Sequence, residues 1–256
     1  MKSLEVTLRD VRARGRKALV PYFMAGVTPD WVQHVAAAVH AGADAIEVGV
    51  PFSDPLMDGV VIQHAATQSL EAGTTLDSLC AELDGADLGA PLVVMTYYNI
   101  FHHYGLRRAA GRLADAGFGG AIVPDLTFEE SGEWREVCDE NDLATIFLVA
   151  PSTTPERFER LAAATQGFCY ASARMAVTGR SSDSGDASRV VDAVRATSDV
   201  PTYVGIGITT PAQARDACQH SDGVIVGSAL VDTILHGATA SDTEEFIRSF
   251  RSAIDA

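Results

Sequence analysis

Lysine is nearly absent, the cysteines are scattered and no long apolar run occurs, and each of these absences excludes a class of protein. Lys2 and Lys17 are the only lysines. A Schiff-base aldolase needs a lysine at the end of a later strand, so that mechanism is disfavoured. The four cysteines form no C-x-x-C pair, which argues against a disulfide framework or a zinc site. No run reaches the roughly 18 apolar residues of a membrane helix, so we expect no membrane span.

Positive charge is also scarce, since 34 acidic residues outnumber 19 basic ones and the formal net charge is −15. A broad nucleic-acid-binding surface is therefore not expected. Small anionic ligands remain compatible with this charge, because backbone N–H groups can hold a phosphate without lysine. The first residues, MKSLEVTLRDVRARGRK, contain no apolar signal region, so we expect a cytoplasmic protein.

What the sequence does contain is a series of short apolar runs, rich in β-branched residues and nearly continuous in hydrophobicity. This pattern is typical of strands that are buried on both faces of a parallel sheet. The eight predicted strands are Ala18–Phe23, Ala45–Val50, Leu92–Tyr97, Ala121–Asp125, Thr145–Ala150, Phe168–Ala173, Thr202–Gly207 and Gly223–Gly227.

Segments with helical periodicity separate these strands, as at Val32, Val35 and Val39. Eight strands that alternate with helices are the number that closes a (β/α)8 TIM barrel. An open doubly wound sheet is the structural rival, but no G-x-G-x-x-G follows the first strand, which weakens its dinucleotide-binding version. We predict one α/β barrel domain over residues 1–256, with extra N- and C-terminal helices at Leu4–Arg14 and Thr243–Ile254.

One predicted strand contains a charged residue, Glu47, in the otherwise apolar run AIEVGV. A buried carboxylate needs a partner, a raised pKa or a catalytic reason. From position alone, a structural ion pair and a catalytic role are equally good interpretations. Asp54 and Asp58 follow in a proline-containing loop, where turns and helix caps are the ordinary explanation. The nearby Glu47 favours function instead, because paired carboxylates in different environments can divide acid–base and electrostatic roles.

Polar residues also stand at the ends of other predicted strands, where a barrel has its active site. Asp125 ends the fourth strand, Tyr97 and Asn99 end the third, and Tyr170 lies in the sixth. None is diagnostic by itself, since tyrosines can simply fill the mouth of a barrel. The seven histidines are scattered without an H-E-x-x-H motif, so we predict no metal site.

Glycines after the last strands are the more informative signal. Gly207 ends VGIG, and Gly227 and Ser228 end the eighth strand just before a helix; Gly179 follows the sixth strand. Loops after strands seven and eight, with the N-terminus of a short helix, form a common phosphate site of these barrels. The residues thus predict metal-free acid–base chemistry on a phosphorylated small molecule.

Longer motifs resemble the tryptophan synthase alpha subunit family. The segment GADAIEVGVPFSDPLMDGVVIQ is similar to its strand-two motif, and VPYFMAG, TYYN, PDLTFEES, FLVAP, YASARMAVTG, VGIGITTPAQA and GVIVGSALV extend the resemblance along nearly the whole chain. The resemblance implies a (β/α)8 lyase that cleaves indole-3-glycerol phosphate to indole and glyceraldehyde 3-phosphate by a retro-aldol reaction. It also implies an α2β2 complex whose beta subunit carries pyridoxal phosphate and receives the indole for L-tryptophan synthesis. No cofactor is expected in this chain.

The resemblance assigns roles residue by residue. Glu47 falls on the general acid–base and Asp58 on the carboxylate that binds the indole N–H. The substrate-binding positions are Tyr97, Tyr170 and Thr178. The phosphate-loop positions are Gly179, Gly207, Gly227 and Ser228, and the positions that face the beta subunit are Pro51, Asp54 and Asn99. We expect burial to raise the pKa of Glu47, and we expect Asp58, closer to water, to remain ionised.

Three alternatives stay open at this point. A stand-alone indole-releasing lyase would use the same carboxylates without activation by a partner. A phosphate-binding isomerase of tryptophan or histidine biosynthesis could share the barrel, although the strand-two motif argues against it. A catalytically silent activator of the beta subunit would not need both Glu47 and Asp58, which this sequence retains.

Overall fold

The computed structural model describes residues 3–172, 184–205 and 207–256, and within them a parallel sheet closes on itself. The strands lie in the order β5-β4-β3-β2-β1-β9-β8-β7-β6, and every pairing is parallel. Their bounds are β1 (Ala18–Met24), β2 (Ile46–Gly49), β3 (Leu92–Met95), β4 (Phe118–Ile122), β5 (Ala144–Ile146), β6 (Leu148–Val149), β7 (Cys169–Ser172), β8 (Thr202–Gly205) and β9 (Gly223–Val226).

The two strands at the ends of that order are one interrupted strand. Only Phe147 separates β5, which pairs with β4, from β6, which pairs with β7. The Phe147 carbonyl accepts the Tyr170 N–H at 3.0 Å, so the ladder continues across the break. Counted this way, eight strands close the barrel, and the predicted (β/α)8 fold is confirmed.

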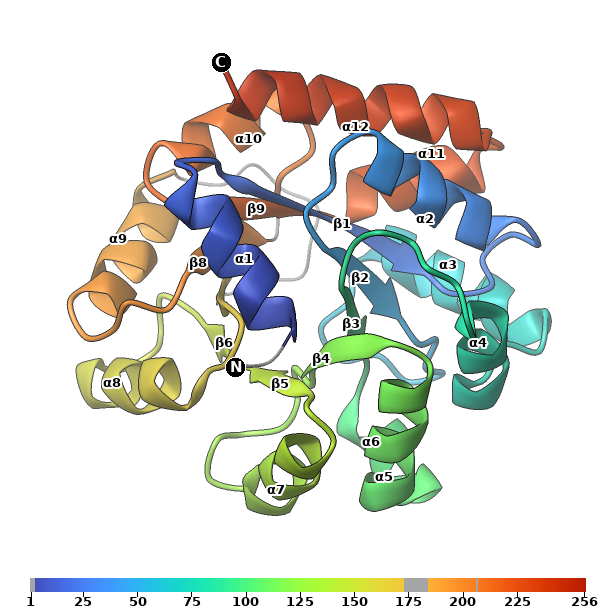
Figure 1. Cartoon of the computed structure of the whole chain (residues 1–256), viewed down its shortest axis with the longest axis horizontal. Helices are drawn as coiled ribbons and strands as arrows, with labels where there is room; N and C mark the ends of the chain where they lie inside the picture. Colours follow the sequence, from blue (N-terminus) through green and yellow to red (C-terminus); the bar gives the residue numbers. More distant parts are fainter. Residues whose placement is uncertain (1–2, 173–183, 206) are drawn as a thin grey trace.

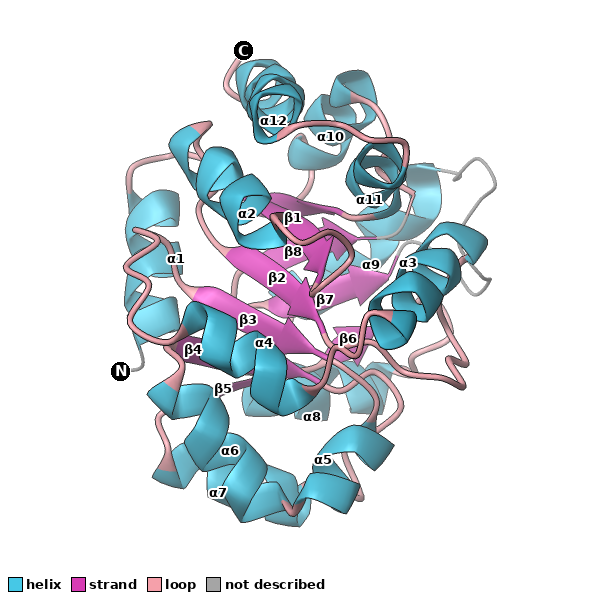
Figure 2. Ribbon diagram, turned by 90° about the vertical axis from the view of Figure 1, so that its right-hand side faces the viewer, coloured by secondary structure: helices cyan, strands magenta, loops and turns pink. Residues whose placement is uncertain are grey.

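Helices form the outer layer around the strands (Figure 2). Their bounds are α1 (Ser3–Ala13), α2 (Trp31–His40), α3 (Val60–Glu71), α4 (Leu76–Leu83), α5 (Tyr98–Tyr104), α6 (Leu106–Asp115), α7 (Gly132–Glu140), α8 (Pro155–Ala164), α9 (Ser184–Arg195), α10 (Pro211–Cys218), α11 (Ser228–Leu235) and α12 (Ala240–Ile254). The predicted terminal helices correspond to α1 and α12. No helix in the described ranges is long and apolar enough to cross a membrane.

The first helix, α1, lies across one end of the strands (Figure 1). Leu4 and Leu8 of α1 are fully buried in a cluster with Phe168 and Tyr203, whose rings stack with centroids 4.6 Å apart. This packing fills the N-terminal end of the barrel. A ligand site is therefore left to the opposite end, where the strands have their carboxyl termini.

The last helix, α12, is fixed by a buried ion pair. Arg251 donates to the Asp44 carboxylate and to the Lys17 carbonyl, each at 2.9 Å. Asp44 also accepts the Leu19 N–H at 3.0 Å. Because this network ties α12 to the start of β1, it stabilises the barrel and takes no part in the site at the open end.

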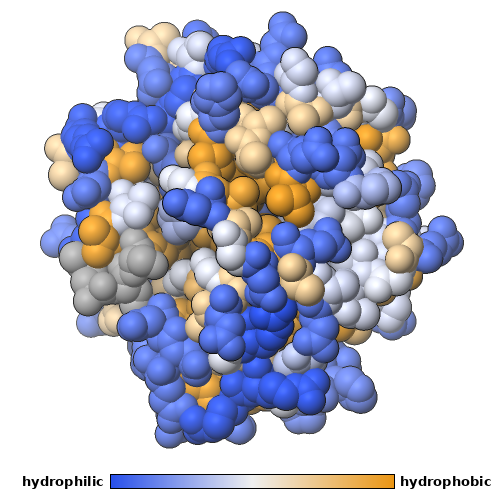
Figure 3. Space-filling model, turned by 45° about the vertical axis from the view of Figure 1, so that its right-hand side comes forward, coloured by the Kyte–Doolittle hydropathy of each residue, from blue (hydrophilic) through white to orange (hydrophobic). Residues whose placement is uncertain are grey.

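On the face drawn in Figure 3, hydrophilic side chains surround small hydrophobic patches.

The fourth strand differs from its prediction. The sequence pattern placed it at Ala121–Asp125, whereas β4 spans Phe118–Ile122. Glycines are unfavourable inside strands, but Gly120 packs so closely on α1 that an added Cβ would lie 2.8 Å from Leu4 Cδ2. Asp125 consequently lies beyond the strand, in the following loop. Its carboxylate accepts the Tyr98 N–H at 2.9 Å, at the start of α5.

Candidate active site

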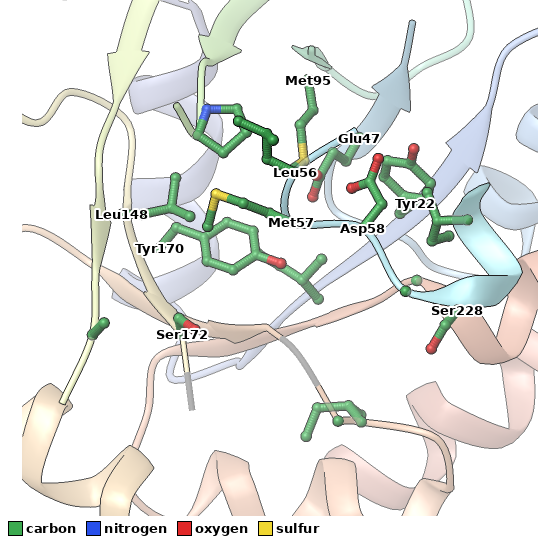
Figure 4. Close-up of a pocket in the computed structure, with 18 of the residues that line it drawn as sticks. Tyr22, Glu47, Leu56, Met57, Asp58, Met95, Leu148, Tyr170, Ser172 and Ser228 are labelled. Atoms are coloured by element: carbon green, nitrogen blue, oxygen red, sulfur yellow. The ribbon is translucent and has the colours of Figure 1, made fainter. Parts of the chain in front are cut away.

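A cavity of about 420 Å³ opens at the carboxyl ends of the strands. Its volume is in the usual range for a small-molecule site. Predicted catalytic and phosphate-binding residues from distant parts of the chain meet in its wall. The lining residues from the prediction are Glu47, Asp58, Tyr170, Gly207, Gly227 and Ser228, and Figure 4 shows several of them as sticks.

Glu47 points into the barrel because side chains alternate along β2. Ile46 and Val48 belong to the core between strands and helices, and Glu47 lies between them on the inner face. Its side chain is 1% exposed, and its Oε2 atom has no hydrogen-bond partner among the described residues. Burial, followed by the charge of Asp58, raises the pKa of Glu47 to about 8. This upward direction agrees with the expectation, and a carboxyl group with such a pKa holds its proton at neutral pH.

Asp58 lies close to Glu47, in the loop after β2, and forms a hydrogen bond with the Tyr97 hydroxyl. Burial raises the pKa of Asp58, while a hydrogen bond from the Tyr97 hydroxyl lowers it. The same hydroxyl accepts the Met57 N–H at 2.9 Å. The Gln63 amide donates to the Asp58 carbonyl at 2.8 Å. These bonds fix the loop so that the carboxylate faces the cavity. Tyr97 itself is 4% exposed and supports Asp58 without lining the cavity.

Two tyrosines complete the polar wall by lying across glycines of the next strand. Tyr22 on β1 extends over Gly49 of β2, where an added Cβ would lie 2.0 Å from the Tyr22 Oη. Tyr170 on β7 extends over Gly205 of β8 in the same way, with a corresponding distance of 2.1 Å. Both rings are buried and both line the cavity. Because neither glycine has a side chain, the phenol groups of Tyr22 and Tyr170 can extend into the cavity.

Gly207, Gly227 and Ser228 lie where the phosphate site was predicted. Gly227 directly precedes α11 and Ser228 is its first residue. The Leu230 N–H already donates to the Gly227 carbonyl at 2.9 Å, so the N–H groups that can serve an anion are those that precede it in the helix. Gly207 has a φ of +92°, a conformation that favours glycine. All three line the cavity with Glu47, and Figure 4 shows Ser228 at the start of a helix. Thr178 and Gly179 lie outside the described residues.

Of the positions predicted to face a partner, Pro51 and Asp54 lie in the loop after β2 and Asn99 lies in α5. Asp54 and Asn99 are exposed, whereas Pro51 is buried in the isolated chain. Two apolar side chains of this region are largely exposed as well: Leu56 at 77% and Val60 at 76%. Exposed large apolar residues that cluster on one loop are typical of an interaction surface.

Some lining residues were not predicted from the sequence. Tyr22, Met57, Leu148 and Ser152 line the cavity, and none was a candidate. For Tyr22 the signal is Gly49, two residues after Glu47, which leaves room over β2; it becomes apparent only once β1 and β2 are paired. Within the described ranges, no group of three or more His, Cys, Asp or Glu could hold a metal ion.

Comparison with known proteins gives a consistent match over nearly the whole chain. The family model described as tryptophan synthase alpha chain matches residues 8–253. Curated proteins of that name from Streptomyces coelicolor and Thermobifida fusca are each 42% identical, over 91% and 100% of this chain and 88% and 97% of their own lengths. A solved structure of Mycobacterium tuberculosis tryptophan synthase superposes with a TM-score of 0.92 at 39% identity, covering 100% of this chain and 99% of that one.

Proposed function

Because this chain belongs to the tryptophan synthase alpha chain family, we propose that its cavity is the active site and that Glu47 and Asp58 perform the family's reaction there. The chain is a lyase, which cleaves indole-3-glycerol phosphate to indole and glyceraldehyde 3-phosphate by a retro-aldol step. The observation that carries the assignment of residues is the buried Glu47 carboxyl, with its pKa near 8 and Asp58 beside it.

The two carboxyl groups have different tasks. Glu47 starts as the neutral acid and gives its proton to indole C3, which converts the ring into an electron sink. Ionised Asp58 accepts the indole N–H and stabilises the positive charge that develops on the ring. When the bond between C3 and the glycerol carbon breaks, its electron pair returns to the ring. The hydroxyl on that carbon loses its proton to the Glu47 carboxylate and becomes the aldehyde.

The phosphate group of the substrate binds at the other side of the cavity. Backbone N–H groups near Gly207, Gly227 and Ser228 hold it, and the N-terminus of α11 supplies favourable partial charge. Tyr170 contacts the substrate from β7, in the same wall as Glu47. Thr178 and Gly179, which lie outside the described residues, are proposed to contribute from the loop after β7.

A beta subunit is the proposed partner, in an α2β2 complex of the cytoplasm. This chain acts in it as one domain without a cofactor of its own, and pyridoxal phosphate belongs to the beta subunit. The loop with Asp54 and exposed Leu56 and Val60 supports the docking face. Asn99 and Pro51 adjoin it, and Pro51 would act by shaping the loop.

An indole-release assay tests this proposal. The purified chain is incubated with indole-3-glycerol phosphate, with and without a tryptophan synthase beta subunit and with and without exhaustive chelation. We expect a basal rate, a higher rate with the beta subunit, and no effect of the chelator. A rate that the beta subunit does not change would indicate a stand-alone lyase. No release under any condition would indicate a silent activator, and recovery by one divalent metal after chelation would contradict the mechanism.

A further inference from the structure

Tyr22 spans the distance between the two halves of the proposed active site. Its Cβ and Cγ atoms are at one end, where an added Cβ at Gly227 would lie 3.6 and 3.8 Å from them. Its hydroxyl is at the other end, over Gly49 and within the electrostatic reach of Asp58 and Glu47. Tyr22 is also the register partner of Glu47 in the neighbouring strand. The ring therefore runs from the phosphate side of the cavity to the acid–base side.

The glycerol chain of the substrate must cover the same distance. Its phosphate occupies the Gly227 end, and its C1′ atom, which is bonded to indole C3, must lie within reach of Glu47. The Tyr22 ring accordingly lies along the glycerol chain, and its hydroxyl ends near C1′. Figure 4 shows the Asp58 carboxylate between Glu47 and the Tyr22 ring, and the charges of both carboxyl groups act on the phenol.

The Tyr22 hydroxyl stays protonated in this surrounding. Burial and then the charges of Asp58 and Glu47 raise its pKa well above 10, with smaller effects from Tyr97 and Tyr170. None of the described residues that line the cavity is a lysine or an arginine. The phenol is thus a hydrogen-bond donor that cannot lose its proton near neutral pH. No hydrogen bond joins its hydroxyl to another described residue, so it is available to a ligand.

We infer that Tyr22 is a further catalytic residue, which donates a hydrogen bond to the C1′ oxygen of indole-3-glycerol phosphate. This inference rests on the proposed function of the cavity. As the C1′ hydroxyl gives its proton to the Glu47 carboxylate, negative charge grows on its oxygen and the bond from Tyr22 strengthens. The C3–C1′ electron pair returns to the indole ring, C1′ becomes the aldehyde carbon, and Tyr22 keeps its own proton throughout. No further reactant is needed.

The Tyr22→Phe variant tests this, because it keeps the ring and removes only the donor. We expect kcat for cleavage to fall at least 10-fold, since the loss of one donor to a developing oxyanion typically costs about 10²–10³-fold. Indole-3-propanol phosphate, which lacks the C1′ hydroxyl, should bind to Tyr22→Phe within twofold of the parent. The matched control is Tyr203→Phe, which removes a buried tyrosine hydroxyl at the closed end of the barrel and should preserve both values.

Each outcome of this experiment either supports or overturns the role of Tyr22. A lower kcat with unchanged affinity for the analogue supports it, because a role limited to packing would weaken both. A kcat within twofold of the parent overturns it, as does a proportional loss of kcat and analogue affinity. The parent chain is assayed in parallel. If the parent itself does not cleave indole-3-glycerol phosphate, the proposed function fails, which is distinct from failure at Tyr22 alone.

Discussion

The Asp58 carboxylate lies beside Glu47, and its charge adds to burial in raising the pKa of Glu47 to about 8. The same neighbour that we propose to stabilise a positive ring thus helps to keep the proton on the proposed catalytic acid. Burial also raises the pKa of Asp58, but the hydrogen bond from the Tyr97 hydroxyl opposes this effect and lowers that pKa. The two carboxyl groups therefore differ in their surroundings, since only Asp58 has a hydrogen bond that favours its charged form.

Replacement of Glu47 by glutamine should abolish turnover while keeping the fold. The amide has nearly the same shape but cannot transfer a proton. Loss of a general acid–base costs about 10²–10⁴-fold, and a group that serves both proton transfers should reach the upper end. Single-turnover cleavage of indole-3-glycerol phosphate is the measurement, with substrate affinity determined separately. If Glu47→Gln cleaves within a few-fold of the parent, another group such as Asp125 or Tyr170 carries the proton.

The same variant should be more stable than the parent at high pH. The pKa of Glu47 is raised from its ordinary value of 4.5 to about 8 on folding, so the native state holds the proton more tightly than the unfolded state. The stabilisation due to that proton is complete below pH 4.5 and is lost as the pH rises through 8. Glutamine does not titrate and avoids this loss.

The check is urea unfolding of parent and Glu47→Gln between pH 5 and 9. We expect the difference in unfolding free energy to shift in favour of the variant with rising pH and to level off above about 8. Glu71→Gln, at an exposed position of α3, is the matched control and should show no such trend. A difference that is independent of pH would mean that Glu47 is not protonated in the native state.

The eight-strand barrel could be predicted because the apolar runs carry strong local information. Seven runs lie on strands nearly as expected, and the terminal helices correspond to α1 and α12. The start of β4 was missed because Gly119 and Gly120 look like loop residues. The close packing of Leu4 of α1, and of Ala144 and Ile146 of β5, against Gly120 explains why glycine is needed there. The break at Phe147 is likewise invisible in a continuous apolar run.

The site could be predicted in part for a similar reason. Glu47 was conspicuous as a charge in an apolar strand, and Gly227 and Ser228 as a glycine turn before a helix. Tyr22 could not be predicted, because a tyrosine in a strand is ordinary. Its side chain reaches the cavity only because Gly49 on the neighbouring strand leaves room for it. For Tyr97 the substrate contact stays a prediction, and the structure adds that its hydroxyl accepts the Met57 N–H next to Asp58. Such relations depend on pairing between strands, which a single sequence does not specify.

A phosphate or sulfate ion should bind at Gly207, Gly227 and Ser228. The reason is the N–H groups at the start of α11 that precede Leu230, next to glycines that permit close approach. A crystal soaked with a substrate analogue should show anion density there, and Gly227→Val should weaken binding of the analogue because its side chain would occupy the space. Density only at an arginine cluster elsewhere on the surface would refute this assignment.

Changes at the exposed loop should affect the response to the partner more than basal chemistry. Asp54→Ala and Asn99→Ala alter exposed side chains outside the cavity lining. We expect reduced activation by the beta subunit and an unchanged basal rate of the isolated chain. Pro51→Ala should act in the same direction through the shape of the loop. The measurement is indole release with a titrated beta subunit, and an equal loss with and without it would make these residues part of the active site or the fold.

Asp58→Asn should impair cleavage severely, although asparagine can still accept a hydrogen bond from the indole N–H. A neutral amide does not stabilise the positive charge that develops on the ring, so we expect a loss of about 10²–10³-fold in kcat. The variant also removes the charge that helps to raise the pKa of Glu47, so the alkaline limb of kcat/KM should move to lower pH.

The matched control is Asp54→Asn, at an exposed aspartate of the same loop, which should change neither quantity in the isolated chain. A pH profile of the residual Asp58→Asn activity separates the two effects. A shifted limb with a nearly normal maximal rate would show that Asp58 acts only by setting the proton affinity of Glu47, and its proposed contact with the ring would then be wrong.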